Sequence, residues 1–147
     1  MEAAGDDGDF DALCQQLHRY QATLRTCFTL ENFDNLIKNG RMRPIVGTLL
    51  RSLGIHIIAD ATAEGTIHVA DKARGVGKTY RAITALMKAS KDCTDAEVVI
   101  SHCENLEGAM ALKRQILADL PVKQVDLLSC RGLTSFYAME KGLIVGY

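Results

Sequence analysis

Apolar and polar positions repeat along the chain with two different periods, which predict both helices and strands. After Asp9, a residue type that caps helices, apolar residues recur at spacings of three and four, which predicts an amphipathic helix. Over residues 24–30 every second side chain shares one face, which predicts a strand. The positions that carry these two patterns are Phe10, Leu13, Leu17 and Tyr20 for the helix and Leu24, Thr26, Phe28 and Leu30 for the strand.

The next segment predicts a short helix that ends at a glycine. Residues 31–38 place Phe33, Leu36 and Ile37 on an inward face, and Asn39-Gly40 follows. Glycine tolerates the positive φ that a helix C-terminus often needs. Proline suits a first helical turn, so a further helix is expected to start at Pro44 and continue to about residue 53.

The remainder of the chain predicts a hairpin followed by alternating helices and strands. Strand patterns at 55–60 and 66–72 flank a turn at 62–65, and a helix is expected at about 76–89. Strands are then expected at 97–103, 124–130 and 142–147, with a helix at 106–120 that Pro121 ends. Crossover helices and an antiparallel hairpin together indicate an α/β fold with a mixed sheet.

Length and composition indicate one domain with a substantial core. The chain has 147 residues, of which 48% are hydrophobic and 24% charged. Residues 9–147 are expected to form this domain, and the acidic, glycine-containing residues 1–8 a disordered leader or a linker. The net charge of −1, the lack of Trp and the 5% aromatic content argue against a nucleic-acid partner.

Five cysteines without a CxxC pair argue against a disulfide framework and favour a reducing cytoplasm. No run approaches the ~18 apolar residues of a membrane span, so a transmembrane segment is not expected. The acidic N-terminus differs from a secretory signal, which also favours a cytoplasmic location.

Catalytic patterns are incomplete, and we expect no enzyme activity. Gly77-Lys78-Thr79 resembles the end of a phosphate loop, but Lys72 stands where that loop needs a glycine. A turn before a helix is the preferred interpretation. His102, Cys103 and Cys130 are too scattered to define a zinc site. No serine lies in a GxSxG elbow.

The Gly40-Arg41 turn is the more informative feature. It belongs to one of two basic runs without acidic residues, at 38–51 and 72–81. A guanidinium binds a carboxylate or phosphate through two parallel hydrogen bonds. The apolar segment 45–50 follows Arg41 in the chain. A cationic turn beside an apolar segment suits an anionic amphiphile as ligand. The alternative interpretation is a surface turn beside a core helix.

Several motifs together resemble the DegV family. The stretch LRTCFTLENFDNLIKNGRM is similar to that family's strand, helix and "L-x-x-L-x-x-G-G-R-[IM]" turn. The 72–78 stretch, ISHCENLEGAMALKRQI and the closing GLIVGY are also similar to family segments, so the resemblance extends from Phe10 onward. It corresponds to the C-terminal lobe only. This implies a mixed, largely antiparallel sheet of about six strands with flanking helices.

The resemblance also implies a function and a set of site residues. DegV proteins bind a long-chain fatty acid between two lobes, and some carry it for a bacterial fatty acid kinase. Arg41 would contact the head group together with Gly40, and Tyr137 stands roughly where many members have a histidine. The chain would line the lipid with the following residues: Ile45, Val46, Leu49, Leu50 and Phe136.

The implied role is therefore a non-catalytic, lipid-binding lobe without a cofactor, whose partners are the fatty acid, an N-terminal lobe and a kinase subunit. Alone, such a lobe is expected to bind fatty acid weakly or not at all and to associate through its exposed apolar cleft. The alternative is an interaction module without a ligand, which docks an acidic partner through the two basic runs.

Overall fold

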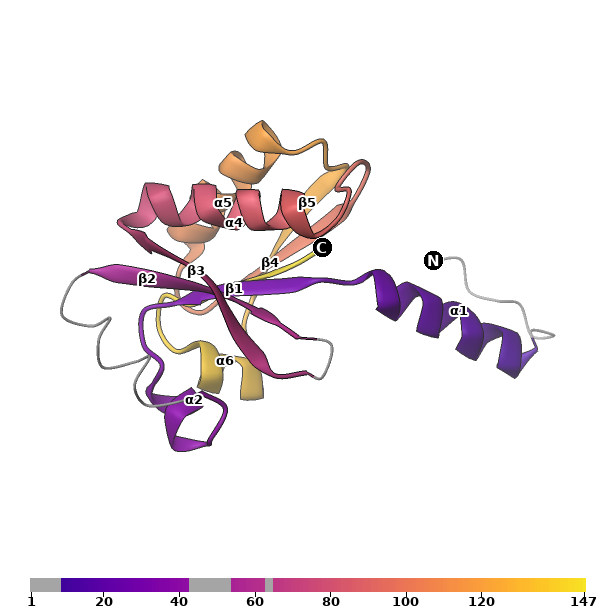
Figure 1. The fold of residues 1–147 in the computed structure, drawn as a ribbon, viewed down its shortest axis with the longest axis horizontal. Coiled ribbons are helices and arrows are strands. Elements are labelled where there is room, and N and C mark those ends of the chain that lie inside the picture. The colour runs from indigo at the N-terminus through magenta and orange to yellow at the C-terminus, as the bar shows by residue number, and fades with distance from the viewer. Residues whose placement is uncertain (1–8, 43–53, 63–64) are drawn as a thin grey trace.

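The computed structural model describes residues 9–42, 54–62 and 65–147. It consists of one six-stranded sheet with helices on both faces (Figure 1). The helices are α1 (Phe10–Thr23), α2 (Asp34–Lys38), α4 (Val76–Ser90), α5 (Leu106–Asp119) and α6 (Gly132–Ala138). The strands are β1 (Thr26–Leu30), β2 (Ile55–Ala61), β3 (Ile67–Arg74), β4 (Glu97–His102), β5 (Gln124–Ser129) and β6 (Leu143–Gly146).

The strand order is β3-β2-β1-β6-β4-β5, and the sheet is mixed. Every neighbouring pair is antiparallel except β4 and β5, which are parallel and joined through α5. A parallel pair needs such a crossover, whereas the β2–β3 hairpin needs only a turn. The predicted fold class, a largely antiparallel mixed sheet with flanking helices, is therefore confirmed.

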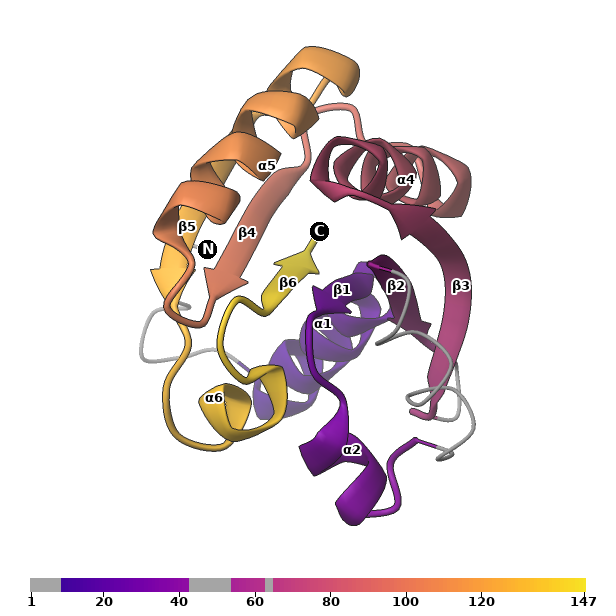
Figure 2. The ribbon, with the colours of Figure 1, turned by 90° about the vertical axis from the view of Figure 1, so that its left-hand side faces the viewer.

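The larger core lies between the sheet and the layer formed by α4 and α5, at the top of Figure 2. Both helices carry apolar side chains on one face at helical spacing. Ile83 and Met87 of α4 and Leu112 and Ile116 of α5 are completely buried there. Strand residues from β2, β4 and β6 complete this core, among them Ile58, Ile100 and Val145.

A smaller core lies under the opposite face of the sheet, where α2 and α6 pack (Figure 2). Successive residues of a strand point to opposite faces. Cys27 of β1 accordingly belongs to the α4/α5 core, while Leu30 belongs to the α2/α6 core. Phe33 and Leu36 are buried with Leu30.

Some element boundaries differ from the predicted ones for local reasons. The first strand begins at Thr26 because Leu24 still caps α1, with its N–H donating to the Gln21 carbonyl. The short helix begins at Asp34 rather than residue 31, since the Asn32 side chain accepts a hydrogen bond from the Asp34 N–H. Helix α6 was not predicted at all.

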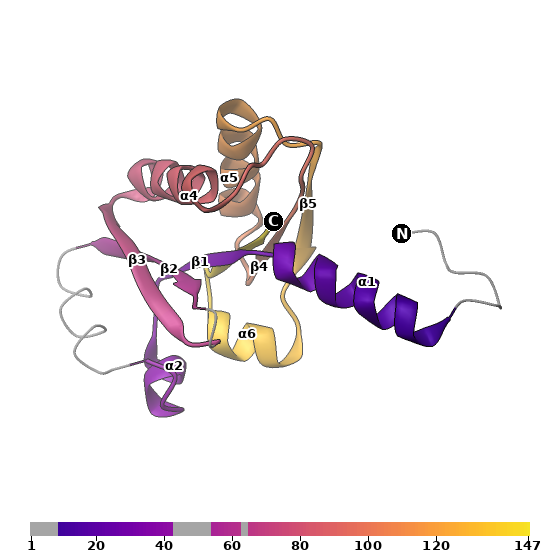
Figure 3. The same ribbon diagram turned by 45° about the vertical axis from the view of Figure 1, so that its right-hand side comes forward.

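Helix α1 extends away from the sheet (Figures 1 and 3) and has no buried residue. Its predicted apolar face is present but uncovered: Phe10 is 74% exposed and Tyr20 60% exposed. Leu13 and Leu17 are also exposed on it. The helix therefore adds no side chain to either core within the described residues.

Candidate ligand-binding site

The predicted Gly40-Arg41 turn ends α2 in a Schellman motif. Gly40 has φ +68°, and its N–H donates to the Ile37 carbonyl at 3.0 Å. The Arg41 N–H donates to the Leu36 carbonyl at 2.8 Å, which completes the two characteristic bonds. The backbone at Arg41 is thus held in place, while its side chain is exposed. No ion pair joins the guanidinium to another described residue.

Helix α6 brings two further predicted residues to the same face of the sheet. The Asn35 side-chain amide of α2 donates to the Phe136 carbonyl of α6 at 2.6 Å. Phe136 is 46% exposed, and its ring meets the half-buried Tyr137 ring edge-on at 5.1 Å. The Gly40-Arg41 turn directly follows α2. The predicted lining residues Ile45, Val46, Leu49 and Leu50 lie outside the described residues.

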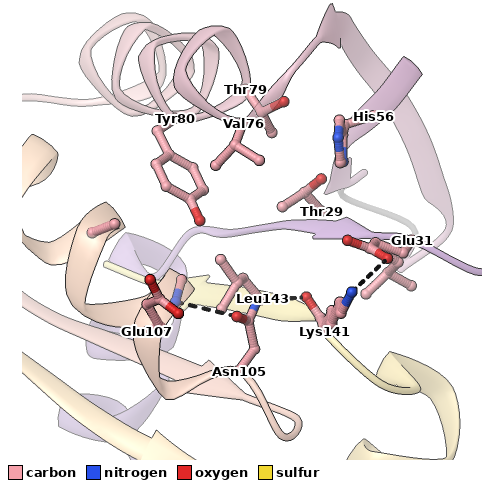
Figure 4. Close-up of a pocket in the computed structure, with 13 residues that line it drawn as sticks. Thr29, Glu31, His56, Val76, Thr79, Tyr80, Asn105, Glu107, Lys141 and Leu143 are labelled. Atoms are coloured by element: carbon pink, nitrogen blue, oxygen red, sulfur yellow. Dashed lines mark hydrogen bonds and ion pairs between the residues drawn. The ribbon is translucent and has the colours of Figure 1, made fainter. Parts of the chain in front are cut away.

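A cavity that the sequence did not predict lies on the other face of the sheet, between the strands and the α4/α5 layer (Figure 4). Its volume is about 320 Å³, near the lower limit of ordinary small-molecule sites. The N-terminal parts of α4 and α5 form one wall, and the ends of β1, β2 and β6 form the other. Its apolar lining comes from Leu30, Val76, Ala111 and Leu143.

Two helices begin at this cavity, and their N-termini are capped in different ways. Gly75, with φ +84°, is the N-cap residue of α4 and supplies no side-chain cap. Gly77, which was expected to belong to a turn before the helix, instead lies in the first turn of α4, and only Gly75 precedes the helix. At α5, the Asn105 side chain accepts from the Gly108 N–H at 3.2 Å, and its amide donates to the Lys141 carbonyl at 2.9 Å.

Hydroxyl groups occupy the middle of the cavity. Thr29 of β1 is 6% exposed, and its hydroxyl has no hydrogen-bond partner among the described residues. The Tyr80 hydroxyl points into the same space in Figure 4, and His56 closes the side above Thr29. Burial raises the pKa of the Tyr80 phenol, and the nearby Glu107 and Glu31 carboxylates raise it further. The phenol is therefore neutral and able to donate a hydrogen bond.

Charged groups stand at the edge of the cavity. Lys141 Nζ lies 3.8 Å from Glu31 Oε2, and both side chains are about half exposed. Glu107 belongs to the first turn of α5, where a carboxylate interacts favourably with the helix dipole. Two carboxylates and one lysine that is already paired make this edge unfavourable for a bound anion.

His102, a sequence candidate for metal binding, already has a hydrogen-bond partner in the described part of the chain. His102 is buried, and its Nδ1 accepts a hydrogen bond from the Asn105 N–H at 3.4 Å. That agrees with the interpretation of a satisfied histidine. Within 9–42, 54–62 and 65–147, the side chains form no metal-binding group of His, Cys, Asp or Glu. Among those same residues, no helix is long and apolar enough to cross a bilayer.

These features define an α/β lobe with a half-open, largely apolar cavity and a fixed cationic turn. The family model described as "Uncharacterised protein, DegV family" matches residues 1–143. The chain belongs to the DegV family. A DegV domain-containing protein of Streptococcus gordonii is 32% identical over 139 residues, which cover 94% of this chain and 49% of that protein. The chain therefore spans about half the length of the relatives it matches.

Solved structures give the same family and the same fold. The fatty acid kinase B3 protein of Streptococcus pneumoniae, loaded with linoleic acid, matches with TM-score 0.85 and 32% identity over 95% of this chain and 50% of that one. A DegV family protein of Eubacterium eligens, loaded with heptadecanoic acid, matches with TM-score 0.87 and 26% identity, with the same two coverages. The family resemblance in the sequence is therefore confirmed.

Proposed function

We propose that this chain is a non-catalytic lobe that binds a long-chain fatty acid. The observation that carries the proposal is its similarity, at 32% identity and TM-score 0.85, to a protein whose structure holds linoleic acid. The cavity supports it, because its apolar side chains, those of Leu30, Val76, Ala111 and Leu143, can contact an alkyl chain in the space between the sheet and two helices. Each CH₂ removed from water contributes about 0.8 kcal/mol.

Arg41 is our proposed contact for the carboxylate. Its turn lies on the α2/α6 face of the sheet and the cavity on the α4/α5 face, so one ligand would reach both by passing the C-terminal end of β1. The Schellman motif holds the turn, so little backbone freedom is lost when the guanidinium binds an anion. No described residue forms an ion pair with that guanidinium, and a guanidinium can bind a carboxylate through two parallel hydrogen bonds. Gly40 is required for the positive φ of the turn. We propose Tyr137 as a second, weaker contact through its hydroxyl, and Phe136 as a lining residue of the same site.

Described residues of this chain line the cavity, which sharpens the expected behaviour of this lobe by itself. An apolar wall that the chain already possesses predicts weak but saturable binding, rather than none. The second lobe and its residues remain part of the proposal, because the relatives are about twice as long.

Substitution of Arg41 tests the head-group assignment. Arg41→Ala removes two charge-assisted hydrogen bonds and should weaken oleic acid binding by at least about tenfold. Equilibrium dialysis with labelled oleic acid measures this change. Arg114→Ala is the matched control, because Arg114 is also exposed but lies on α5 outside the cavity lining. Equal binding by the two variants would contradict the assignment.

Presentation of the acyl carboxylate to a kinase partner is the finer part of the proposal. The solved relative named as a fatty acid kinase B3 protein supports it. The basic run at β3 and the start of α4 is exposed in the structure at Lys72, Arg74 and Lys78, which suits an acidic partner surface.

This exposed run also favours the alternative function, an interaction module without a ligand. Charge reversal at Lys72, Arg74 and Lys78 separates the two functions. In the module, partner binding falls steeply and depends strongly on salt, while the affinity for oleic acid stays unchanged. If the chain is a lipid-binding lobe, it binds oleic acid saturably, and Arg41→Ala lowers that binding. A chain that binds no fatty acid but captures an acidic partner would favour the module.

A further inference from the structure

Cys103 and Cys130 are neighbours at the C-terminal ends of the parallel strands β4 and β5. The last registered pair of these strands is His102 with Ser129. The two cysteines stand one residue farther along each strand, where the Cys130 N–H donates to the His102 carbonyl at 2.8 Å and so continues the ladder. Neighbouring strands lie about 4.8 Å apart, within the Cα separation of about 4.4–6.8 Å that disulfides span.

Both cysteine side chains lie on the same face of the sheet. Successive strand residues point to opposite faces, and Val98 of β4 and its partner Val125 of β5 both belong to the α4/α5 core. Both cysteines instead pack against the smaller α2/α6 core. Burial raises the pKa of the Cys130 thiol, and the nearby Cys103 raises it further, which agrees with a short separation of the two sulfurs.

The five cysteines of the chain are free thiols that differ in their surroundings. Cys27 and Cys93 are 0% and 4% exposed in the α4/α5 core, on the other side of the sheet. Cys103 and Cys130 are half-buried, which leaves them more open to a small oxidant than the core thiols. Cys14 is also half-buried, but it lies on α1, which extends away from the sheet (Figure 3).

We propose that Cys103 and Cys130 form a reversible oxidation site, where a peroxide converts the two thiols into a disulfide that joins β4 to β5. The thiolate of one cysteine attacks a peroxide oxygen, the O–O bond breaks, and a sulfenic acid and hydroxide form. The sulfur of the second cysteine then attacks the sulfenic sulfur, and the S–O bond breaks as the S–S bond forms. The peroxide accepts two electrons from the two sulfurs, and their two protons leave in two waters. A dithiol such as dithiothreitol reverses the reaction by thiol–disulfide exchange.

This disulfide would fasten an edge of the sheet. Strand β5 is the last in the strand order, next to β4. The link would also close a loop that contains α5 and β5. Because a closed loop restricts the unfolded chain, the oxidised chain should unfold at a higher temperature than the reduced chain, by about 5–10 °C.

Peptide mapping after treatment with hydrogen peroxide tests the proposal. The reduced chain is oxidised, unreacted thiols are blocked with iodoacetamide after unfolding, and the chain is cleaved after Lys, Arg and Glu residues. Glu97 lies between Cys93 and Cys103, so this cleavage assigns each sulfur separately. We expect a linked peptide pair that joins Cys103 to Cys130, the loss of both free thiols together, and their return after dithiothreitol.

Two variants identify the sulfurs responsible. Cys103→Ser leaves Cys130 without its neighbour, so hydrogen peroxide should form no disulfide within that chain and should not raise its thermal midpoint. Cys14→Ser is the matched control, because Cys14 is also half-buried but lies on α1, and this variant should keep the link. Serine is close in size to cysteine, and circular dichroism shows whether each variant folds like the parent chain.

The alternative outcomes each overturn the proposal. Separate oxidation of Cys103 and Cys130 to sulfinic acids, without a linked peptide, would mean that the sheet does not bring the two sulfurs together. A link from either cysteine to Cys14, Cys27 or Cys93 in its place would mean the same. A Cys103–Cys130 link that does not raise the thermal midpoint would contradict the fit of the two positions in the ladder.

Discussion

The two buried threonines provide a paired test of the structure, because the same substitution should change stability in opposite directions. Thr29 and Thr84 are 6% and 4% exposed, so a valine is equally buried at either position. They differ in their hydroxyl groups. That of Thr29 has no partner in the described structure, and that of Thr84 donates to Asp119 at 2.7 Å.

The expected magnitudes follow from these partners. An unsatisfied buried polar group destabilises a fold by about 1–3 kcal/mol, so Thr29→Val should stabilise the ligand-free chain by about 1–2 kcal/mol. Thr84→Val removes a satisfied bond and should destabilise by about 1 kcal/mol, at the lower end because Asp119 is exposed and can bind water. The two variants should therefore differ by roughly 2–3 kcal/mol.

Urea unfolding without lipid, followed by circular dichroism, measures both changes from the midpoint and slope of each curve. Equal slopes would show that each substitution changes stability and not the unfolded state. The reasoning is refuted if Thr29→Val is destabilising, or if both substitutions shift the midpoint in the same direction. Either result would mean that Thr29 has a hydrogen-bond partner in the ligand-free protein.

Two further predictions concern backbone packing and pH. Gly142→Ala should destabilise the fold by at least about 2 kcal/mol, because the new Cβ would overlap the Ala138 carbonyl oxygen. Gly146→Ala should cost less than about 1 kcal/mol, because the space around its Cβ is open. Thermal unfolding compares the two variants. Hydrogen bonds from Thr84 and Gln115 hold the pKa of Asp119 below its ordinary value of 3.8. A lowered carboxyl pKa adds stability that is present above pH 3.8 and lost as the pH falls through the folded-state pKa, so Asp119→Asn should flatten the acid limb of stability against pH. An unchanged acid limb would contradict that assignment.

Hydrophobic periodicity predicted most of this fold, since most strands and helices have one buried face. The hairpin, α4 and the β4-α5-β5 unit lie within one or two residues of their predicted bounds. Helix α6 escaped prediction because Gly132-Leu133-Thr134-Ser135 has no helical apolar period, and Leu133 is 70% exposed. Its position is fixed by packing on the sheet and on α2, which are distant in sequence.

The candidate site was only partly accessible to sequence reasoning. The Gly40-Arg41 turn could be predicted, because a positive φ at a helix end favours glycine and the family motif includes the arginine. The cavity could not be predicted, because its walls come from five elements that only the sheet order brings together. Its one sequence signal is a threonine at position 29, between apolar neighbours on a strand. A polar residue there matters only once its burial and missing partner are known.

Titration of the ¹⁵N-labelled chain with oleic acid, followed by amide NMR spectra, tests the central claim most directly because it also detects weak binding. The account predicts saturable shifts at Thr29, Ala111 and Leu143, which line the cavity, and at Arg41, and predicts that Arg41→Ala weakens them. The absence of saturable shifts at any concentration below oleic acid aggregation, or shifts confined to the exposed face of α1, would contradict it.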